Sequence, residues 1–431
     1  MSNLRKLGDH THPCTDEGRI MSKPRAPGFA TLAAAALACA LAAPGAALAQ
    51  TSYGVAMLSD YSGPYADIMP MLGRSREVVL DWWNAEVGAK LGVKLNHKNF
   101  DTRYDAAQTA SLWPGIKSEM KPIAVLGLGG PDVAALGQRL PDDGIPLFMS
   151  TAGYGYAWKP DSWIINPRPT YTHEAAAAFK WLKSRRGGSQ PLKVGIISSE
   201  ASPAYVDIAR GIERYAKDNP NEIQVVETIF TEVQPTDIST QVRRLVRGGV
   251  EAISIQTNTA AVVATKRALQ GLGAKVPVIT SSHNGLPASG KAAGGLNQME
   301  GDYEAYGMGI ASDEDTPARR FYEKLKADYK LAAPWNVLTL MGMSQALYTV
   351  RVIEHAIKKH GAQNLTGAKV RETLYAEPVT TEETFGTLPT LKFTKEAPFP
   401  VVGLKVNIAT ITGGKYVTAA TNVDTPAVKK W

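Results

Sequence analysis

Short apolar segments rich in Val and Ile alternate with amphipathic segments along most of the chain, and the same alternation occurs twice. The expected strands of the first half span 53–59, 93–100, 123–126 and 146–149, with helices at 69–86, 106–113 and 133–140. Those of the second half span 193–198, 223–230, 252–256 and 276–280, with helices at 205–217, 238–247 and 261–272. Strands that alternate with helices form parallel sheets. The pattern therefore predicts an α/β chain with two similar lobes.

The pattern changes after residue 307. Helices are expected at 318–329, 337–359 and 368–375, followed by strands at 390–393, 401–411 and 415–418. Gly413-Gly414 joins the last two strands as a hairpin turn. This tail is too short to form a third core, so we expect it to complete the two lobes. Within the first half, Pro114 and Gly115 are expected to end the second helix early.

The first 49 residues have the pattern of a secretory signal peptide with an N-terminal extension. Lys23 and Arg25 precede an Ala/Leu-rich run that ends at Ala47-Leu48-Ala49, an A-x-A cleavage site. Met21 would start a signal peptide of ordinary length, so either Met1 or Met21 is the true start. A signal-anchor helix is the alternative. The cleavable signal predicts a periplasmic protein.

Composition excludes several classes of function. Both cysteines, Cys14 and Cys39, lie in the leader, so thiol chemistry, disulfides and cysteine zinc sites are excluded from the mature chain. The formal net charge is +7, but the basic residues are scattered rather than gathered into a patch that would follow a phosphate backbone. We therefore expect no nucleic-acid partner.

A glycine-rich loop, Gly127-Leu128-Gly129-Gly130-Pro131-Asp132, follows a buried apolar strand. It fails the dinucleotide fingerprint because Asp132 stands where the last glycine is needed, and it lacks the Gly-Lys-Ser/Thr end of a P-loop. The expected geometry has Gly130 as the N-cap and Pro131 at the first helical position, with the N–H groups of 132 and 133 free. Such a loop suits a small anion, and a simple strand-to-helix turn is the alternative.

No catalytic constellation is visible. The histidines of the mature chain form no H-E-x-x-H motif, there is no G-x-S-x-G elbow, and no carboxylate pair has a spacing that indicates acid–base chemistry. We therefore expect a protein that is not an enzyme and has no catalytic residues, cofactor or metal site.

Polar and aromatic residues instead follow the expected strands of both lobes. They occur at 60–65, 130–132 and 150–154 in the first lobe, and at 200–205, 257–259 and 281–284 in the second. Ligands of open α/β sheets bind in the crevice at the carboxyl ends of the strands. Two such crevices that face each other would form a ligand-binding cleft.

At this point the chain resembles the periplasmic substrate-binding proteins of branched-chain amino acid (leucine/isoleucine/valine-binding) ABC transporters. Ser62-Gly63-Pro64-Tyr65-Ala66 is similar to the S/T-G-P-x-A turn of that family, and residues 101–106 resemble its D-x-x-x-D-P-x-x-A segment. Residues 144–152 resemble G-V-P-x-I-S-x-x-A/T. Residues 204–211, 236–238 and 269–277 resemble three later motifs, and the order and spacing of the set are specific.

The resemblance implies two Rossmann-like lobes, the type I periplasmic binding protein fold, joined by a three-crossover hinge. The crossovers are expected near 166–171, 307–312 and 378–388. The N-terminal lobe would comprise 50–168 plus 310–380, and the C-terminal lobe 169–309 plus 381–431. The implied partners are a small-molecule ligand and ABC permease subunits at the inner membrane, and the protein is expected to be a monomer. A ligand-sensing module for a membrane receptor is the alternative.

The family's carboxylate-holding positions correspond here to Pro131-Asp132 and to Ser150, Thr151 and Ala152. The family often has an acid for the ligand's α-ammonium where this chain has His283 and Asn284. Asp132 stands where a small hydroxyl residue is usual, and it either pairs with a ligand amine or caps its own helix. The candidate ligand-binding residues are Tyr65, Gly130, Asp132, Ser150, Thr151, Ala152, Tyr154, Tyr205, Thr257, Asn258, His283 and Asn284.

Tyrosines and a tryptophan near the expected cleft edges suit apolar or planar ligands. The expected ligand is therefore a small carboxylate or amide, with an aromatic body as one option and a branched-chain amino acid as another.

Overall fold

A computed structural model describes residues 50–151, 153, 159–396 and 404–429. Residues from Gln50 onward form one compact unit. The predicted signal peptide, residues 1–49, lies outside the described residues, as do Ala152 and Tyr154 of the predicted site.

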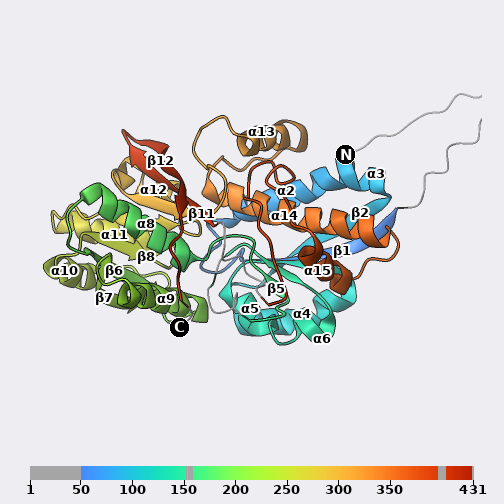
Figure 1. The fold of residues 1–431 in the computed structure, drawn as a ribbon, viewed down its shortest axis with the longest axis horizontal. Helices are drawn as coiled ribbons and strands as arrows, with labels where there is room; N and C mark the ends of the chain where they lie inside the picture. The colour runs from blue at the N-terminus through green and yellow to red at the C-terminus, as the bar shows by residue number, and fades with distance from the viewer. Residues whose placement is uncertain (1–49, 152, 154–158, 397–403, 430–431) are drawn as a thin grey trace, which may run out of the picture. The chain divides into compact units, whose positions relative to one another are not determined.

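The first lobe is built on a five-stranded parallel sheet with the order β2-β1-β3-β4-β5 (Figure 1). Its strands are β1 (Thr51–Ser59), β2 (Val93–Asp101), β3 (Pro122–Gly127), β4 (Leu147–Met149) and β5 (Ile164–Ile165). Its helices are α2 (Met69–Trp83), η1 (Asn84–Gly88), α3 (Ala89–Leu91), α4 (Ala106–Met120), α5 (Gly130–Leu136) and α6 (Leu140–Asp143). Three later helices also pack here: α13 (Pro317–Tyr329), α14 (Val337–His360) and α15 (Gly367–Ala376).

The second lobe is built on a seven-stranded sheet with the order β12-β11-β10-β9-β8-β6-β7. Its strands are β6 (Leu192–Ser199), β7 (Ile223–Thr231), β8 (Ala252–Ile255), β9 (Val278–Ser281), β10 (Tyr303–Tyr306), β11 (Lys405–Thr412) and β12 (Lys415–Asp424). Its helices are α8 (Tyr171–Arg186), α9 (Pro203–Asp218), α10 (Ser239–Arg247), α11 (Thr259–Gly271), α12 (Leu286–Ala293) and η2 (Leu296–Met299).

Strands β6 to β10 repeat the order of the first sheet, which confirms the prediction of two Rossmann-like α/β lobes. The two added strands, β11 and β12, are antiparallel and form the predicted hairpin. Gly413 and Gly414 at its turn both have positive φ, at 59° and 70°, a geometry that glycine adopts without strain.

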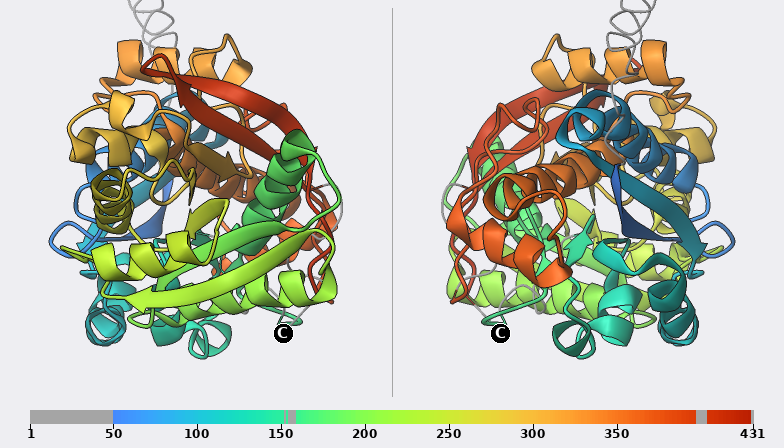
Figure 2. Two further views of the ribbon diagram at one scale, coloured as in Figure 1. Left: turned by 90° about the vertical axis from the view of Figure 1, so that its left-hand side faces the viewer. Right: turned by 90° about the vertical axis from the view of Figure 1, so that its right-hand side faces the viewer.

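Each sheet has helices on both faces (Figure 2). In the first lobe, the residues of a strand alternate between the two cores. In β1, Val55 and Met57 pack on the α2 and α14 side, whereas Ala56 and Leu58 pack on the α4 and α5 side. In the second lobe, one core lies between the sheet and helices α8 and α9, and another lies between the sheet and helices α10 to α12. Burial on both faces explains why the central strands β3 and β4 are apolar along their whole length.

Two expected elements are wrong. Pro114 does not end its helix, because α4 continues to Met120. The burial of Trp113 and Ile116 against the sheet offsets the roughly 3 kcal/mol that an interior proline costs. Residues 390–393 form no strand, although Leu391 and Phe393 are buried.

The sequence pattern did not predict β5, α8, α12 and β10, nor the short segments α3, α6 and η2. Helix α8 was missed because its first nine residues, Tyr171 to Phe179, are all buried. A helix segment that is buried all round carries no amphipathic period.

The chain passes between the sheets in three segments, at 166–170, 307–316 and between α15 and β11. The first two segments agree with the expected positions. The third passage lies later than expected, because Phe385 packs on Trp82 and Phe393 packs on Tyr348, both in the first lobe. Lys395 also contacts the first lobe, because its carbonyl oxygen accepts a hydrogen bond from the N–H of Asp161. We propose a lobe boundary after Lys395 as an alternative to the predicted boundary at 380/381.

Candidate ligand-binding site

A mainly apolar cavity lies where the carboxyl ends of the two sheets meet. Its volume is about 30 Å³, which is room for one or two waters. Its lining residues are Tyr65, Ile68, Tyr104, Leu128, Gly130, Val133, Met149, Thr151, Gly153, Ile164, Asn166, Tyr171, Ala204, Tyr205, Ile208 and His283.

Tyr65 reaches the cavity from the loop after β1. Asp60, at the end of that strand, holds the loop in place by accepting hydrogen bonds from the N–H groups of Gly63 (2.5 Å) and Tyr65 (2.8 Å). Burial raises the pKa of Asp60 although these two bonds act in the opposite direction. The Asp60 carboxyl group thus fixes the turn at residues 62–66, which resembles a family motif, and thereby positions the ring of Tyr65.

Tyr104 is a lining residue that the sequence reading did not select. Arg103 and Tyr104 have φ values of 55° and 53°, in the left-handed region that is unfavourable for bulky side chains. This backbone geometry places the Tyr104 ring 4.7 Å from the ring of Tyr65 and 6.2 Å from that of Tyr205. Gly129 faces the Tyr104 ring, and a Cβ there would overlap it.

Tyr205 comes from the second lobe, near the start of α9. Ser202 caps this helix by accepting from the N–H of Ala204 at 3.3 Å. The hydroxyls of Tyr65 and Tyr205 are hydrogen-bonded to each other across the cleft. Burial raises the pKa of both phenols, so they remain neutral donors and acceptors at physiological pH. One aromatic cluster, Tyr65, Tyr104 and Tyr205, thus closes the cavity from both lobes.

Further contacts across the cleft place the two lobes in a closed arrangement. The carbonyl oxygen of Pro64 accepts from Asn258 Nδ2 at 3.3 Å and from Gln234 Nε2 at 3.4 Å. Thr259 Oγ1 donates to Asp67 Oδ2 at 2.7 Å. An added Cβ on Gly130 would lie 2.6 Å from Cβ of Ala204, so only glycine permits this approach of α5 to α9.

The glycine-rich loop does not leave its amides free for a ligand. Asp132 Oδ2 accepts from the N–H groups of Leu128 (2.7 Å) and Gly129 (3.1 Å), and the N–H groups of Asp132 and Val133 turn toward the Gly129 carbonyl. The N-cap is Gly129 rather than Gly130. Of the two roles considered for Asp132, the structure shows the cap, and the amides expected to bind an anion, those of 132 and 133, face the Gly129 carbonyl instead.

His283 lines the cavity from the loop after β9. Its Nδ1 is 2.7 Å from Ser281 Oγ, and its ring centroid is 4.5 Å from that of Tyr171. Burial, together with the nearby charge of Arg168, lowers the pKa of His283 to about 3, against an opposing contribution from the Thr257 carbonyl. The imidazole is therefore neutral at physiological pH.

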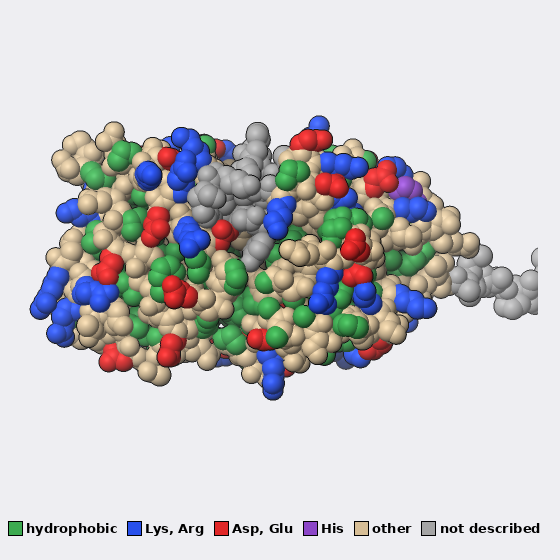
Figure 3. All heavy atoms as spheres, turned by 90° about the horizontal axis from the view of Figure 1, so that it is seen from below, with side chains coloured by type: hydrophobic (Ala, Val, Ile, Leu, Met, Phe, Trp, Pro, Cys, Tyr) green, Lys and Arg blue, Asp and Glu red, His purple; other side chains and the backbone are tan. Residues whose placement is uncertain are grey.

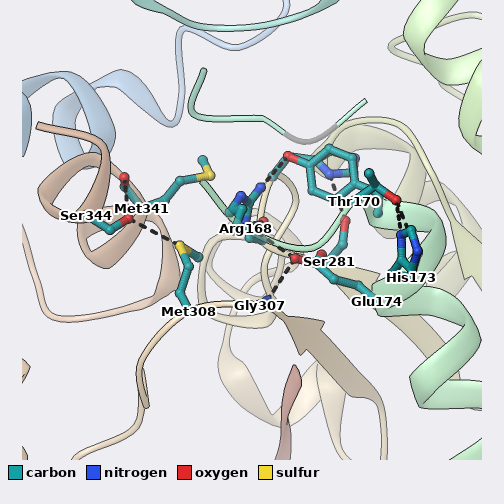
Figure 4. A network of polar contacts seen from close by, with 12 residues as sticks. Arg168, Thr170, His173, Glu174, Ser281, Gly307, Met308, Met341 and Ser344 are labelled. Atoms are coloured by element: carbon teal, nitrogen blue, oxygen red, sulfur yellow. Dashed lines mark hydrogen bonds and ion pairs between the residues drawn. The ribbon is translucent and has the colours of Figure 1, made fainter. Parts of the chain in front are cut away.

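A buried network lies behind this wall and joins two crossovers (Figure 4). Arg168 donates to Ser282 Oγ at 2.8 Å and to the Tyr171 hydroxyl at 3.1 Å, and it pairs with Glu174 at 3.4 Å. Glu174 Oε1 also accepts from the N–H of Gly307, at the start of the second crossover, at 2.8 Å. Burial raises the pKa of Glu174 to about 7 although Arg168 and the Gly307 N–H favour its ionised form. The network ties the hinge to the ring of Tyr171.

The structure brings only part of the predicted set to the cavity: Tyr65, Gly130, Thr151, Tyr205 and His283. Ser150, Thr257, Asn258, Asn284 and Asp132 are buried but are not among the described lining residues.

Their polar groups hold the local backbone instead. Ser150 Oγ donates to the Leu128 carbonyl, Asn258 caps α11, and Asn284 Nδ2 donates to the carbonyls of Ile255 and Thr257. Ser150, Asn258 and Asn284 were predicted as ligand contacts, and in the structure their side chains brace the loops that follow the strands.

Asn166 is the most informative residue that the sequence reading missed. It was assigned only to the first crossover, and no motif marks it. In the structure it is 4% exposed and lines the cavity, and among the described residues neither its Oδ1 nor its Nδ2 has a hydrogen-bond partner.

Charged side chains of both signs are interspersed on the face shown in Figure 3. That face therefore has no single-sign basic field of the kind that nucleic acids require. Within the described part of the chain, no three His, Cys, Asp or Glu side chains gather as a metal site would require. The helices described there include none with the length and apolar character needed to span a bilayer.

Two similar α/β lobes that close on a mostly apolar cavity define a two-lobed binding protein. Residues 52–401 match the model of the periplasmic binding protein family, and the chain belongs to that family. This is a family of binding proteins rather than enzymes. No curated protein matches the chain in sequence.

Solved structures with the same fold include a branched-chain amino acid ABC transporter protein from Thermus thermophilus with bound valine. It is 20% identical with a TM-score of 0.74, over 88% of this chain and 97% of that one. A fatty acid ABC transporter substrate-binding protein from Thermomonospora curvata is 18% identical with a TM-score of 0.72, over 87% and 93%. A branched-chain amino acid transporter substrate-binding protein from Streptococcus pneumoniae in complex with isoleucine is 16% identical with a TM-score of 0.68, over 87% and 100%.

Proposed function

We propose that this protein is the extracytoplasmic substrate-binding component of an ABC importer. The observation that carries the proposal is the cavity at the facing carboxyl ends of two Rossmann-like sheets, closed by hydrogen-bonded tyrosines from the two lobes. Residues 1–49 would direct export to the periplasm, where the mature protein acts as a monomer and delivers its ligand to permease subunits. The ABC transporter proteins of similar fold support this role.

The ligand is expected to be a small molecule with an apolar or aromatic body. Aliphatic and aromatic side chains form most of the lining, and Thr151, Asn166 and His283 provide a few polar groups. A ligand larger than one or two waters must move the rings of Tyr65 and Tyr205 apart, so capture requires the lobes to open. The candidates are amino acids, aromatic acids and amides.

A thermal-shift screen of the protein isolated from the periplasm tests ligand binding. We expect amides or acids without an α-amino group to raise the melting temperature, because the described lining residues beside His283 include no acid that could pair with an ammonium group. A response limited to leucine-like amino acids would contradict this ligand class, and the absence of any stabilising small molecule would contradict the binding function. N-terminal sequencing checks cleavage after Ala49, and loss of ligand uptake in a deletion strain checks import.

A further inference from the structure

Asn166 presents an unpaired amide to the cavity. It follows β5 at the first crossover, its side chain is 4% exposed, and both of its polar atoms lack partners. Buried polar groups of folded proteins are almost always hydrogen-bonded, so an unpaired group that faces a ligand cavity indicates a contact that the ligand completes. A flip of the Asn166 amide, which interchanges Oδ1 and Nδ2, leaves this conclusion unchanged.

Charged groups are missing from the cavity wall as far as the structure describes it. No Asp, Glu, Lys or Arg is among its described lining residues. Arg168 and Glu174 lie behind the wall and pair with each other, and Asp132 binds its own loop. A ligand carboxylate or ammonium buried here would therefore touch no charged partner among the described lining residues.

We propose that Asn166 binds an uncharged carboxamide or lactam group of the ligand. This inference rests on the proposed binding function and narrows its ligand class. The side-chain amide of Asn166 offers one acceptor and two donors in one plane, and a ligand amide offers the complementary donor and acceptor. A carboxylate would leave the Asn166 oxygen unpaired, and an ammonium group would leave its nitrogen unpaired. The remaining body of the ligand packs against the rings of Tyr65, Tyr104 and Tyr205.

His283 provides a second polar contact on the same wall. Its Nδ1 is engaged by Ser281 Oγ, whereas Nε2 has no described partner at hydrogen-bond distance and the ring lines the cavity. A neutral imidazole adds no charge, which agrees with an uncharged ligand group. Nε2 can donate to or accept from that group, according to the tautomer that Ser281 selects.

Matched probes that share one ring test this inference. Calorimetry with phenylacetamide, phenylacetate and phenylalanine should show the amide binding at least about tenfold more tightly than the other two. Tighter binding of the acid or the amino acid, or binding of none of the three, would overturn the inference. Binding of the acid or the amino acid without binding of the amide would refute the inference about Asn166 but would still support the proposed binding function. Failure of the inference can therefore be distinguished from failure of the proposed function.

Asn166→Leu removes the amide at nearly constant volume. We expect amide affinity to fall at least about tenfold, while the melting temperature without ligand stays equal or rises because an unpaired buried group is lost. Asn166→Asp, which replaces the donor with an acceptor, should lose affinity similarly and provides a second variant if the first is unstable. Asn221→Leu, at an exposed position, should leave affinity unchanged. Unaltered amide affinity in both Asn166 variants would refute the assignment.

Discussion

Glu304 allows a quantitative test of the electrostatics of this fold. Its carboxyl group is fully buried on β10, where Oε2 accepts from the N–H of Leu286 at 2.9 Å. Burial raises the pKa of Glu304 from 4.5 to about 8, with a smaller contribution from Glu174, although the Leu286 N–H and the Tyr416 hydroxyl favour the ionised form. The folded protein therefore keeps a proton that the unfolded chain releases above a pH of about 4.5.

The direction and size of the effect follow from proton linkage. Because the pKa is raised on folding, the stabilisation is complete below the unfolded pKa and is lost as the pH rises through the folded pKa. The gap between the two pKa values corresponds to about 5 kcal/mol, at about 1.4 kcal/mol per unit. The Glu304 contribution to the free energy of unfolding should thus decline by as much as about 5 kcal/mol between pH 4.5 and pH 8.

Glu304→Gln isolates this contribution, because an amide resembles the protonated acid and does not titrate. Urea unfolding at a series of pH values should show the variant gaining stability relative to the wild type as the pH rises. Glu119→Gln, at a half-exposed surface pair with Lys98, should instead follow the wild-type curve. Parallel curves for Glu304→Gln and the wild type would refute the conclusion that the buried carboxyl keeps its proton.

Three further predictions concern closure and the loop that supports it. Gly130→Ala should weaken ligand binding at least tenfold and change the free energy of unfolding by no more than about 1 kcal/mol, because the added Cβ meets Ala204 only when the lobes close. Calorimetry measures the affinity and small-angle scattering measures the closure, and an undiminished affinity would contradict the prediction. Asp132→Ala should destabilise the protein by about 2 to 5 kcal/mol in urea unfolding, since two buried N–H groups lose their acceptor; a change below 1 kcal/mol would exclude the capping role. Thr259→Val should lower ligand affinity about twofold to tenfold, because the hydrogen bond to Asp67 is lost, and the effect should appear mainly as faster ligand release. An unchanged release rate in stopped-flow measurements would exclude that bond as a closure contact.

Local patterns in the sequence were enough to establish most of the architecture. The repeated strand and helix alternation, the Gly413-Gly414 turn and the length of α14 were all readable, because periodicity and turn chemistry depend on residues close in sequence. Helix α8 was not readable, because burial from all sides removes its amphipathic period. The continuation of α4 past Pro114 was not readable either, because burial of its neighbours offsets the cost of the proline.

The cavity depended on contacts that sequence does not display. Tyr65 and Tyr205 lie 140 residues apart and meet only because both loops follow strands at facing sheet edges. The sequence showed that residue 132 carries a carboxyl group and residue 166 an amide, but it did not show which groups they contact. Tertiary structure decided that the carboxyl group of Asp132 serves its own loop and that the amide of Asn166 remains unpaired, because a hydrogen-bonding group is satisfied or left free by its neighbours in space.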